Sequence, residues 1–282
     1  MTLDFKDLEI DRIAFTERLE VIRSEGEPHG GWYRYGSMAN FGLLVELQPV
    51  DGGISGISSI ADIGGADGDM SFYLSSKGYD VELIDHAETN ANGLEGAKML
   101  RDALNSNVAI YDVDLDKGEQ LPRESYDLVL FLGILYHLEN PYMALKMLSN
   151  VSKNLILSTK ISSRDSGGNP WFENQAVAYL VDTYECNNDP TNFWVFSPAG
   201  LRRMISRTGW KILSERRVGA VGDSEPASME KDERMFVWLQ STKFEQQGHC
   251  PQRNSRRSTD RVSRTGFGGS KFLERHDAPP VD

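Results

Sequence analysis

Short apolar segments alternate with helix-length segments between residues 59 and 159, and this alternation restricts the fold more than any other feature of the sequence. Strands separated by helices of this size pair in parallel, because each helix carries the chain back across the sheet. The sequence therefore predicts an α/β fold, with a parallel central sheet and helices on both of its faces. We expect strands at 59–63, 80–85, 108–112, 126–133 and 154–159, and helices at 70–77, 93–104 and 142–148.

The end of the predicted sheet has a different pattern. After a helix at 198–208, strands are expected at 210–214 and 233–240. The polar segment at 219–232 leaves no room for a crossover helix, so these two strands should pair antiparallel. The sequence thus predicts a seven-stranded sheet, made of five parallel strands and a terminal antiparallel hairpin.

Three further segments lie outside the alternation. Residues 1–56 are expected to form a helical N-terminal cap before the main domain at 57–242. An aromatic-rich insert at 162–196 follows the carboxyl end of the fifth strand, where loops cover ligands in open α/β sheets. We interpret this insert as a substrate lid or, alternatively, as a packed surface excursion. Residues 243–282 hold few apolar side chains and are predicted to be a disordered tail.

Composition indicates the cell compartment and the classes of partner to expect. The chain has 2 cysteines and no apolar run near the roughly 20 residues that cross a bilayer. Its first residues lack the apolar stretch of a signal peptide. These features predict a cytoplasmic protein with no membrane partner. The formal net charge of −12 disfavours a large nucleic-acid substrate, because an acidic surface repels phosphates.

A glycine-rich turn directly after the first strand, at residues 60–69, carries the strongest chemical signal. Such a turn lets the backbone approach a ligand closely, and the helix that follows offers free N–H groups. A dinucleotide fingerprint needs glycine at positions 64, 66 and 69, where this chain has Gly64, Ala66 and Asp69. Asp62, within the strand, suits a cationic ligand such as an ammonium or a sulfonium. A nicotinamide-dependent oxidoreductase and a non-catalytic nucleotide-binding module therefore remain only as alternatives.

The run from Asp62 to Gly68 resembles the first motif of class I S-adenosylmethionine-dependent methyltransferases, D-x-G-x-G-x-G, with Ala66 at the middle glycine. The resemblance extends over roughly residues 59–240 and includes the terminal hairpin. It implies a Rossmann-like fold, S-adenosylmethionine as cofactor and methyl transfer to an O, N or C nucleophile, without a metal. By this likeness, the methionine part of the cofactor is held by Asp62, Gly64, Gly65, Ala66 and Gly68.

The ends of the second and third strands provide the remaining cofactor candidates. A carboxylate at Asp85 can accept hydrogen bonds from both ribose hydroxyls, although this geometry serves more than one cofactor. His86 follows and is either a further contact or an exposed side chain. The class I resemblance places the adenine contact at Asp112, beside Val113. Asp114 and Asp116 stand nearby, so that assignment is ambiguous.

The fourth strand is followed by residues 133–141, which should face the ligand because that strand lies beside the first one. They resemble the G-x-L-Y-H-x-x-x-P signature of the tRNA wobble-uridine carboxymethyltransferases and their relatives. The likeness also covers 192–197 and 201–210. In those enzymes the tyrosine, here Tyr136, helps to bind a carboxylated S-adenosylmethionine. The resemblance thus implies tRNA and the carboxylated donor as alternatives to a small-molecule acceptor and the ordinary donor.

An acidic stretch at 224–233 stands where those enzymes carry arginines, so we expect no cationic partner for a donor carboxylate beside Tyr136. This favours ordinary S-adenosylmethionine and a small-molecule acceptor.

Residues of this signature and of the N-terminal aromatic segment are candidates for contact with ligands. Gly133 and Ile134 are expected to line the cofactor site. His137 is a candidate general base, since its ordinary pKa lies near neutrality, or else a structural histidine that caps the turn before Pro141. Tyr136 is expected to orient the reacting groups or to pack. The N-terminal aromatic residues Tyr33 and Tyr35 either close over the cofactor or belong to the core.

Overall fold

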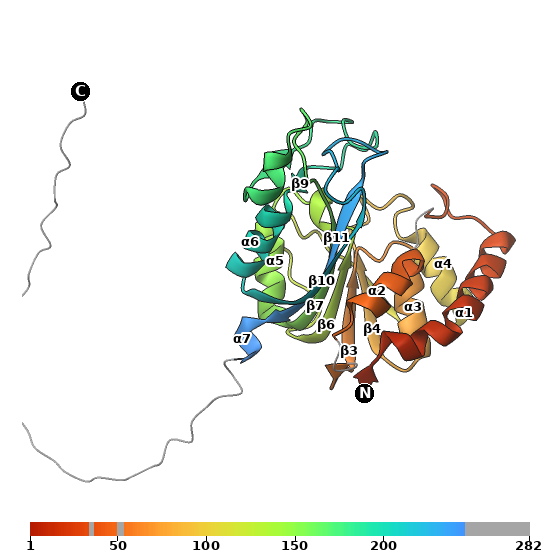
Figure 1. Cartoon of the computed structure of the whole chain (residues 1–282). Helices are drawn as coiled ribbons and strands as arrows, with labels where there is room; N and C mark the ends of the chain where they lie inside the picture. The colour runs from red at the N-terminus through yellow and green to blue at the C-terminus, as the bar shows by residue number, and fades with distance from the viewer. Residues whose placement is uncertain (34–36, 50–53, 246–282) are drawn as a thin grey trace, which may run out of the picture. The chain divides into compact units, whose positions relative to one another are not determined.

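The computed structural model describes residues 1–33, 37–49 and 54–245. A twisted sheet runs through the centre, with α1 to α4 on one side and α5 and α6 on the other (Figure 1). Tyr35 and most of the predicted tail lie outside the described residues. No helix of the described part is long and apolar enough to cross a membrane.

The five parallel strands and the terminal hairpin occur as predicted, in the order β10-β11-β7-β6-β3-β4-β5. Neighbours from β7 to β5 pair in parallel, whereas β11 is antiparallel to both β7 and β10. The strands are β3 (Ser59–Ile63), β4 (Asp80–Asp85), β5 (Ala109–Asp112), β6 (Tyr126–Leu132), β7 (Ser152–Ile161), β10 (Trp210–Gly219) and β11 (Glu233–Ser241).

Alternating side chains of each strand enter separate apolar layers on the two faces of the sheet. In β6, Leu128 and Leu130 pack towards α1, α2 and α3, whereas Val129 and Phe131 pack towards α5 and α6. Both faces are therefore buried, which explains why the parallel strands have continuous apolar sequences.

The helices cover these layers. They are α1 (Phe5–Glu25), α2 (Phe41–Leu47), α3 (Asp69–Ser76), α4 (Glu95–Leu104), α5 (Pro141–Val151), α6 (Pro198–Arg207) and the short α7 (Thr242–Glu245), with 3-10 turns at Ser37–Asn40, Leu135–His137 and Pro170–Asn174. Asp4 caps α1 by accepting from the backbone of Lys6, and Ser197 caps α6 by accepting from that of Gly200. Free N–H groups at both helix starts are thus satisfied by side chains.

Two strands extend further than predicted. β7 continues to Ile161, because β11 pairs with it from Asn154 opposite Gln240 to Ile161 opposite Glu233. The prediction ended β10 at residue 214, before the charged run 215–217, but β10 continues to Gly219. The expected N-terminal helical cap also contains a strand, β1 (Thr2–Leu3), which pairs with β2 (Ile54–Ser55).

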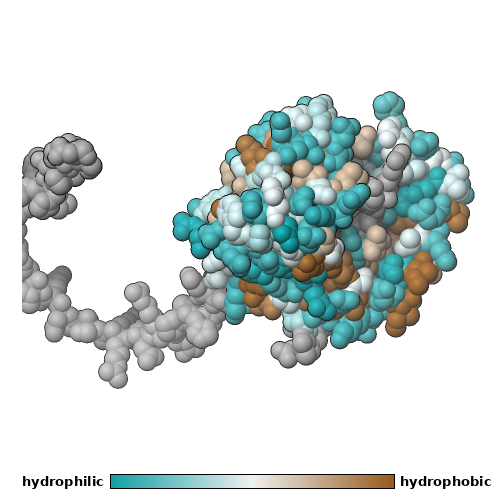
Figure 2. Space-filling model, turned by 45° about the horizontal axis from the view of Figure 1, so that its top comes forward, coloured by the Kyte–Doolittle hydropathy of each residue, from teal (hydrophilic) through white to brown (hydrophobic). Residues whose placement is uncertain are grey.

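The insert at 162–196 has some regular structure of its own. β8 (Ala178–Leu180) pairs antiparallel with β9 (Trp194–Phe196), and Phe196 of β9 adjoins Ile161 at the end of β7. Figure 2 shows a largely hydrophilic face with separate apolar areas. Among the large apolar residues exposed on the insert are Trp171, Leu180 and Tyr184.

Candidate functional site

The turn after β3 has a tight, left-handed backbone. Gly64 and Gly68 have φ values of 70° and 87°, and Ala66 between them has φ 53°. A Cβ atom on Gly64 would lie 2.1 Å from Cδ1 of Ile134, so the close approach to the end of β6 requires glycine there. Ala66 keeps the conformation that glycine would adopt, at a cost of about 1–2 kcal/mol. Alanine at the middle position is therefore compatible with the left-handed backbone of the turn.

Asp62, in β3, lies against the backbone of this turn. Its side chain is buried and accepts a hydrogen bond of 2.7 Å from Oγ of Ser71 in α3. Burial raises the pKa of Asp62 to about 6, opposed by the Ser71 hydrogen bond. A Cβ atom on Gly65 would lie 2.9 Å from Oδ2 of Asp62, so the carboxylate lies against the turn's backbone. A cation near this carboxylate would stabilise its charged form and oppose the effect of burial on its pKa.

Asp85, at the end of β4, ties that strand to the turn. Its carboxylate accepts hydrogen bonds from the backbone of Ala66 at 3.0 Å and of His86 at 2.8 Å, and from the side chain of Asn90 at 3.1 Å. Burial raises its pKa, and these three bonds oppose the rise. A carboxylate offers about four lone-pair sites, so one remains for a ligand hydroxyl.

The end of β5 lies beside Asp85, as predicted from a parallel sheet. The backbone N–H of Val113 donates to the carbonyl of Asp85 at 2.9 Å. Asp112 is exposed, and its carboxylate accepts from the backbone of Ala87 at 2.9 Å. His86 is partly buried in the same region. These predicted cofactor residues therefore share one edge of the sheet.

The two other carboxylates near Asp112 have local structural partners. Asp114 pairs with Lys117 at 2.9 Å, and this hydrogen bond lowers the pKa of the carboxyl group. Asp116 accepts from the backbone of Glu139 and Asn140, at 3.0 and 2.8 Å, directly before α5. Of the three candidates, Asp112 alone ends the strand, which favours it as the adenine contact.

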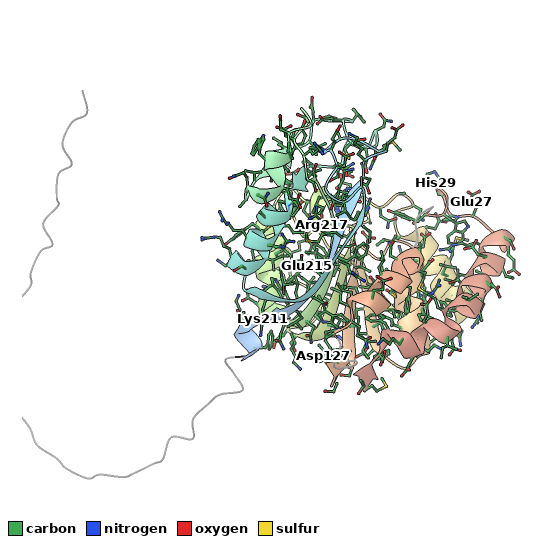
Figure 3. The ribbon with its side chains drawn as sticks, viewed as in Figure 1. Glu27, His29, Asp127, Lys211, Glu215 and Arg217 are labelled. Carbon is green, nitrogen blue, oxygen red and sulfur yellow. The ribbon has the colours of Figure 1, made fainter. Side chains whose placement is uncertain are left out.

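The N-terminal segment contacts the glycine-rich turn through charges that the sequence analysis missed. Arg23, in the last turn of α1, pairs with Asp69 at 2.6 Å and lies 3.8 Å from Asp67. The backbone of Tyr33 donates to Asp67 at 2.8 Å, and the Tyr33 hydroxyl accepts from the backbone of Ala91 at 2.9 Å. Tyr33 therefore bridges the loops after β3 and β4. Figure 3 shows His29 and Glu27 on this segment, at the end of the molecule opposite Asp127 at the start of β6.

The segment that follows β6 lies at the same carboxyl edge of the sheet. Gly133 turns the chain at φ 79°, Ile134 packs on Gly64, and the 3-10 turn carries Tyr136 and His137. The rings of Tyr136 and His137 lie 4.1 Å apart. The structure thus brings Ile134 against the turn after β3, as expected for neighbouring strands, and places Tyr136 and His137 on the 3-10 turn that follows.

At the turn before Pro141, Asp116 rather than His137 accepts from the backbone of Glu139 and Asn140. Nδ1 of His137 instead lies 2.9 Å from the hydroxyl oxygen of Thr191 and 3.2 Å from its carbonyl oxygen. Burial lowers the pKa of His137 below its ordinary value. A neutral imidazole is the form that can accept a proton.

The expectation that no cation lies beside Tyr136 is wrong. Arg234, at the start of β11, has Nη1 3.4 Å from the Tyr136 hydroxyl, and its guanidinium lies 5.5 Å from the ring centre. Asp232 bridges Arg234, at 3.3 Å, to the buried Lys160, at 2.6 Å. The acidic stretch ends at Glu233, which bonds Arg217 rather than facing Tyr136, so the next residue supplies the cation.

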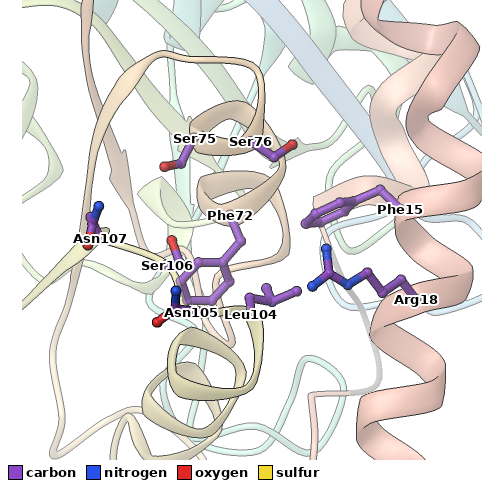
Figure 4. Close-up of a pocket in the computed structure, with 9 residues that line it drawn as sticks. All are labelled: Phe15, Arg18, Phe72, Ser75, Ser76, Leu104, Asn105, Ser106 and Asn107. Atoms are coloured by element: carbon purple, nitrogen blue, oxygen red, sulfur yellow. The ribbon is translucent and has the colours of Figure 1, made fainter.

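A separate pocket of about 250 Å³ lies between α1, α3 and the turn after α4, near the amino ends of the strands. Figure 4 shows its side chains, among them Phe15, Arg18 and Phe72. None of the predicted site residues lines it.

The family model of the methyltransferase domain matches residues 42–215, more than half of the chain. The N-terminal domain of EvdMO1 with SAH bound has a TM-score of 0.48 and 20% identity, over 66% of this chain and 75% of that one. The PH0226 protein from Pyrococcus horikoshii OT3 has a TM-score of 0.47 and 16% identity, over 72% and 87%.

A third solved structure is the 1,6-didemethyltoxoflavin-N1-methyltransferase of Burkholderia thailandensis, with bound 1,6-didemethyltoxoflavin and S-adenosylhomocysteine. It has a TM-score of 0.46 and 14% identity, over 66% of this chain and 72% of that one. A search of curated proteins finds no match.

Proposed function

The chain belongs to the methyltransferase domain family, and we propose that it transfers the methyl group of S-adenosylmethionine to a small-molecule acceptor at the carboxyl edge of its sheet. The observation that carries this proposal is the hydrogen bond between Ala66 of the glycine-rich turn and Asp85. It joins the predicted methionine-binding turn to the predicted ribose-binding residue.

The residues present fit S-adenosylmethionine. Asp62 offers a buried carboxylate beside a turn whose backbone passes close to it, which suits the cationic methionine part. Asp85 keeps acceptor capacity for a ribose hydroxyl. When bound, this cofactor would supply a methyl group on a positively charged sulfur, and the chain's task is to orient the two reactants.

His137 would take the proton that the acceptor's nucleophilic atom loses. Its Nε2 atom has no hydrogen-bond partner among residues 1–33, 37–49 and 54–245. Tyr136 lies against its ring and limits the ways in which it can turn. The acceptor would therefore approach from the side of Nε2.

Calorimetry with S-adenosylmethionine, S-adenosylhomocysteine and NAD tests the proposal, with Asp85→Ala as the diagnostic variant. We expect the first two ligands to bind and Asp85→Ala to weaken them roughly tenfold or more. The reason is that a hydrogen bond to a charged group contributes about 1.5–3 kcal/mol. Asp102→Ala, which removes an exposed carboxylate of α4, is the matched control. Tighter binding of NAD, or unchanged affinity in a folded Asp85→Ala protein, would contradict the assignment.

A small-molecule acceptor fits the chain's net charge of −12, which disfavours phosphate-rich partners. Screening small molecules that bear O–H or N–H groups for acceptor-dependent formation of S-adenosylhomocysteine would identify it. Turnover with tRNA and with none of the small molecules would overturn this choice.

A second candidate is a wobble-uridine-like enzyme that uses carboxylated S-adenosylmethionine, and Arg234 favours it. The guanidinium lies beside the hydroxyl of Tyr136, so the two groups could hold a donor carboxylate together. This candidate shares the Asp62 to Gly68 turn and Asp85 with the first.

The second candidate predicts that Arg234→Met weakens the carboxylated donor about tenfold or more, by the loss of a charge-assisted hydrogen bond. Ordinary S-adenosylmethionine should bind both proteins alike. Tyr136→Phe should have the same selective effect. Direct binding of the two donors to the three proteins measures this. Equal loss of both donors, or tighter binding of the ordinary donor to the unaltered protein, excludes the second candidate.

A further inference from the structure

The insert at 162–196 contacts two consecutive residues of the 3-10 turn that follows β6. The backbone N–H of Phe193 donates to the carbonyl of Tyr136 at 2.9 Å. Thr191 lies beside Nδ1 of the next residue, His137. A segment 54 positions away in the sequence therefore surrounds one side of the candidate base.

Asp189 fixes the direction of the hydrogen bonds at this contact. The hydroxyl of Thr191 donates to Oδ1 of Asp189 at 2.7 Å, and the backbone of Thr191 donates to the same oxygen at 2.9 Å. A hydroxyl has one proton, so the Thr191 oxygen presents only lone pairs to His137. The carbonyl of Thr191 is an acceptor as well. Both neighbours of Nδ1 thus accept, and the proton of the neutral imidazole belongs on Nδ1.

We propose that Asp189 and Thr191 are positioning residues, which hold His137 with its proton on Nδ1 and its lone pair on Nε2. This inference rests on the proposed function, in which Nε2 accepts the acceptor's proton, and it assigns the insert a part in preparing the base. A histidine with the opposite tautomer would present an N–H to the acceptor and could not take its proton.

The carboxylate of Asp189 also lies near the positive charge that develops on His137 during the reaction. When the acceptor's O–H or N–H proton moves to Nε2, His137 becomes a cation with protons on both nitrogens. Oδ2 of Asp189 lies 4.0 Å from Nδ1 and stabilises that cation. The positive charge of Arg234, from β11, destabilises the His137 cation. The ring of Tyr136 lies beside the imidazole. Asp189 and the Thr191 carbonyl therefore oppose the effects of burial and of Arg234 on the pKa of His137.

Nitrogen-15 NMR of the imidazole rings tests the proposal without donor or acceptor. The chain has 5 histidines, and the signals lost in His137→Gln identify those of His137. We expect the shifts of the neutral ring to show the proton on Nδ1. A proton on Nε2 in the unaltered protein would overturn the proposal. Because no substrate is present, this result stands apart from the outcome of the cofactor-binding experiment.

Two variants then separate positioning from a merely structural role. In Asp189→Asn, the pKa of His137 should fall and the share of the Nε2–H tautomer should rise, because the amide carries no charge and can donate to Thr191. Thr191→Val removes the hydroxyl at nearly constant size and should act in the same direction. It decides the question if Asp189→Asn fails to fold.

Asp182→Asn, an exposed carboxylate elsewhere in the insert, is the matched control and should leave both the tautomer and the pKa unchanged. Folded Asp189→Asn or Thr191→Val protein with the spectrum and the pKa of the unaltered chain would overturn the proposal.

Discussion

His137→Ala is expected to lower methyl transfer by about 10²–10⁴-fold, the usual range for loss of a general base. The affinity for S-adenosylmethionine should barely change, because the contacts predicted for this cofactor do not include the imidazole of His137. The experiment measures formation of S-adenosylhomocysteine with an acceptor found by screening, together with calorimetry of the donor.

His29→Ala is the control for this prediction. His29 lies on the segment after α1 and uses its backbone N–H, at 3.0 Å from Glu95, rather than its ring (Figure 3). Its removal should leave turnover unchanged. Added imidazole should restore part of the activity of His137→Ala if the lost group is a base. A folded His137→Ala protein with full turnover would exclude that role.

The order of strands and helices could be predicted because the signal for each element is local. Residues 59–63 are a short apolar run closed by glycines, and β3 has those same bounds. The end of β10 could not be predicted in this way. Glu215 and Arg217 are charged, but Arg202 neutralises the first and Glu233 the second, and both partners come from other elements.

The candidate site likewise contains residues that local sequence patterns predict and contacts that they do not. Asp62, Gly64 and Asp85 stand at strand ends, where the sequence pattern itself predicts them, and the structure places them together. The missed contacts join residues far apart in the chain: Arg23 and Asp69 are 46 positions apart, and Tyr136 and Arg234 are 98 apart. Arg234 lies inside a predicted strand, and no local pattern shows which face it occupies or what it meets.

Glu233→Ala is expected to destabilise the protein by about 3–5 kcal/mol, the usual cost of breaking a buried ion pair by removing one partner. Glu233 is fully buried and accepts from Arg217 at 2.6 Å and from Ser163 at 2.8 Å. Arg217 also pairs with Glu173 of the insert at 2.6 Å. Removing Glu233 would leave Arg217 with Glu173 as its ionic partner, and would take the buried acceptor from the hydroxyls of Ser163 and Ser224. Urea unfolding followed by tryptophan fluorescence measures the loss.

Glu215→Ala, two residues from Arg217 on the same strand, is the matched control (Figure 3). Its pair with Arg202 at 2.6 Å is partly exposed, so its loss should cost only about 0–1 kcal/mol. The difference between the two variants isolates the effect of burial from that of charge. Because Arg217 joins the hairpin to Glu173, Glu233→Ala should also loosen the insert, seen as faster hydrogen exchange at 170–174. Equal stabilities of the two variants would show that the cluster around Glu233 contributes no more than a surface pair.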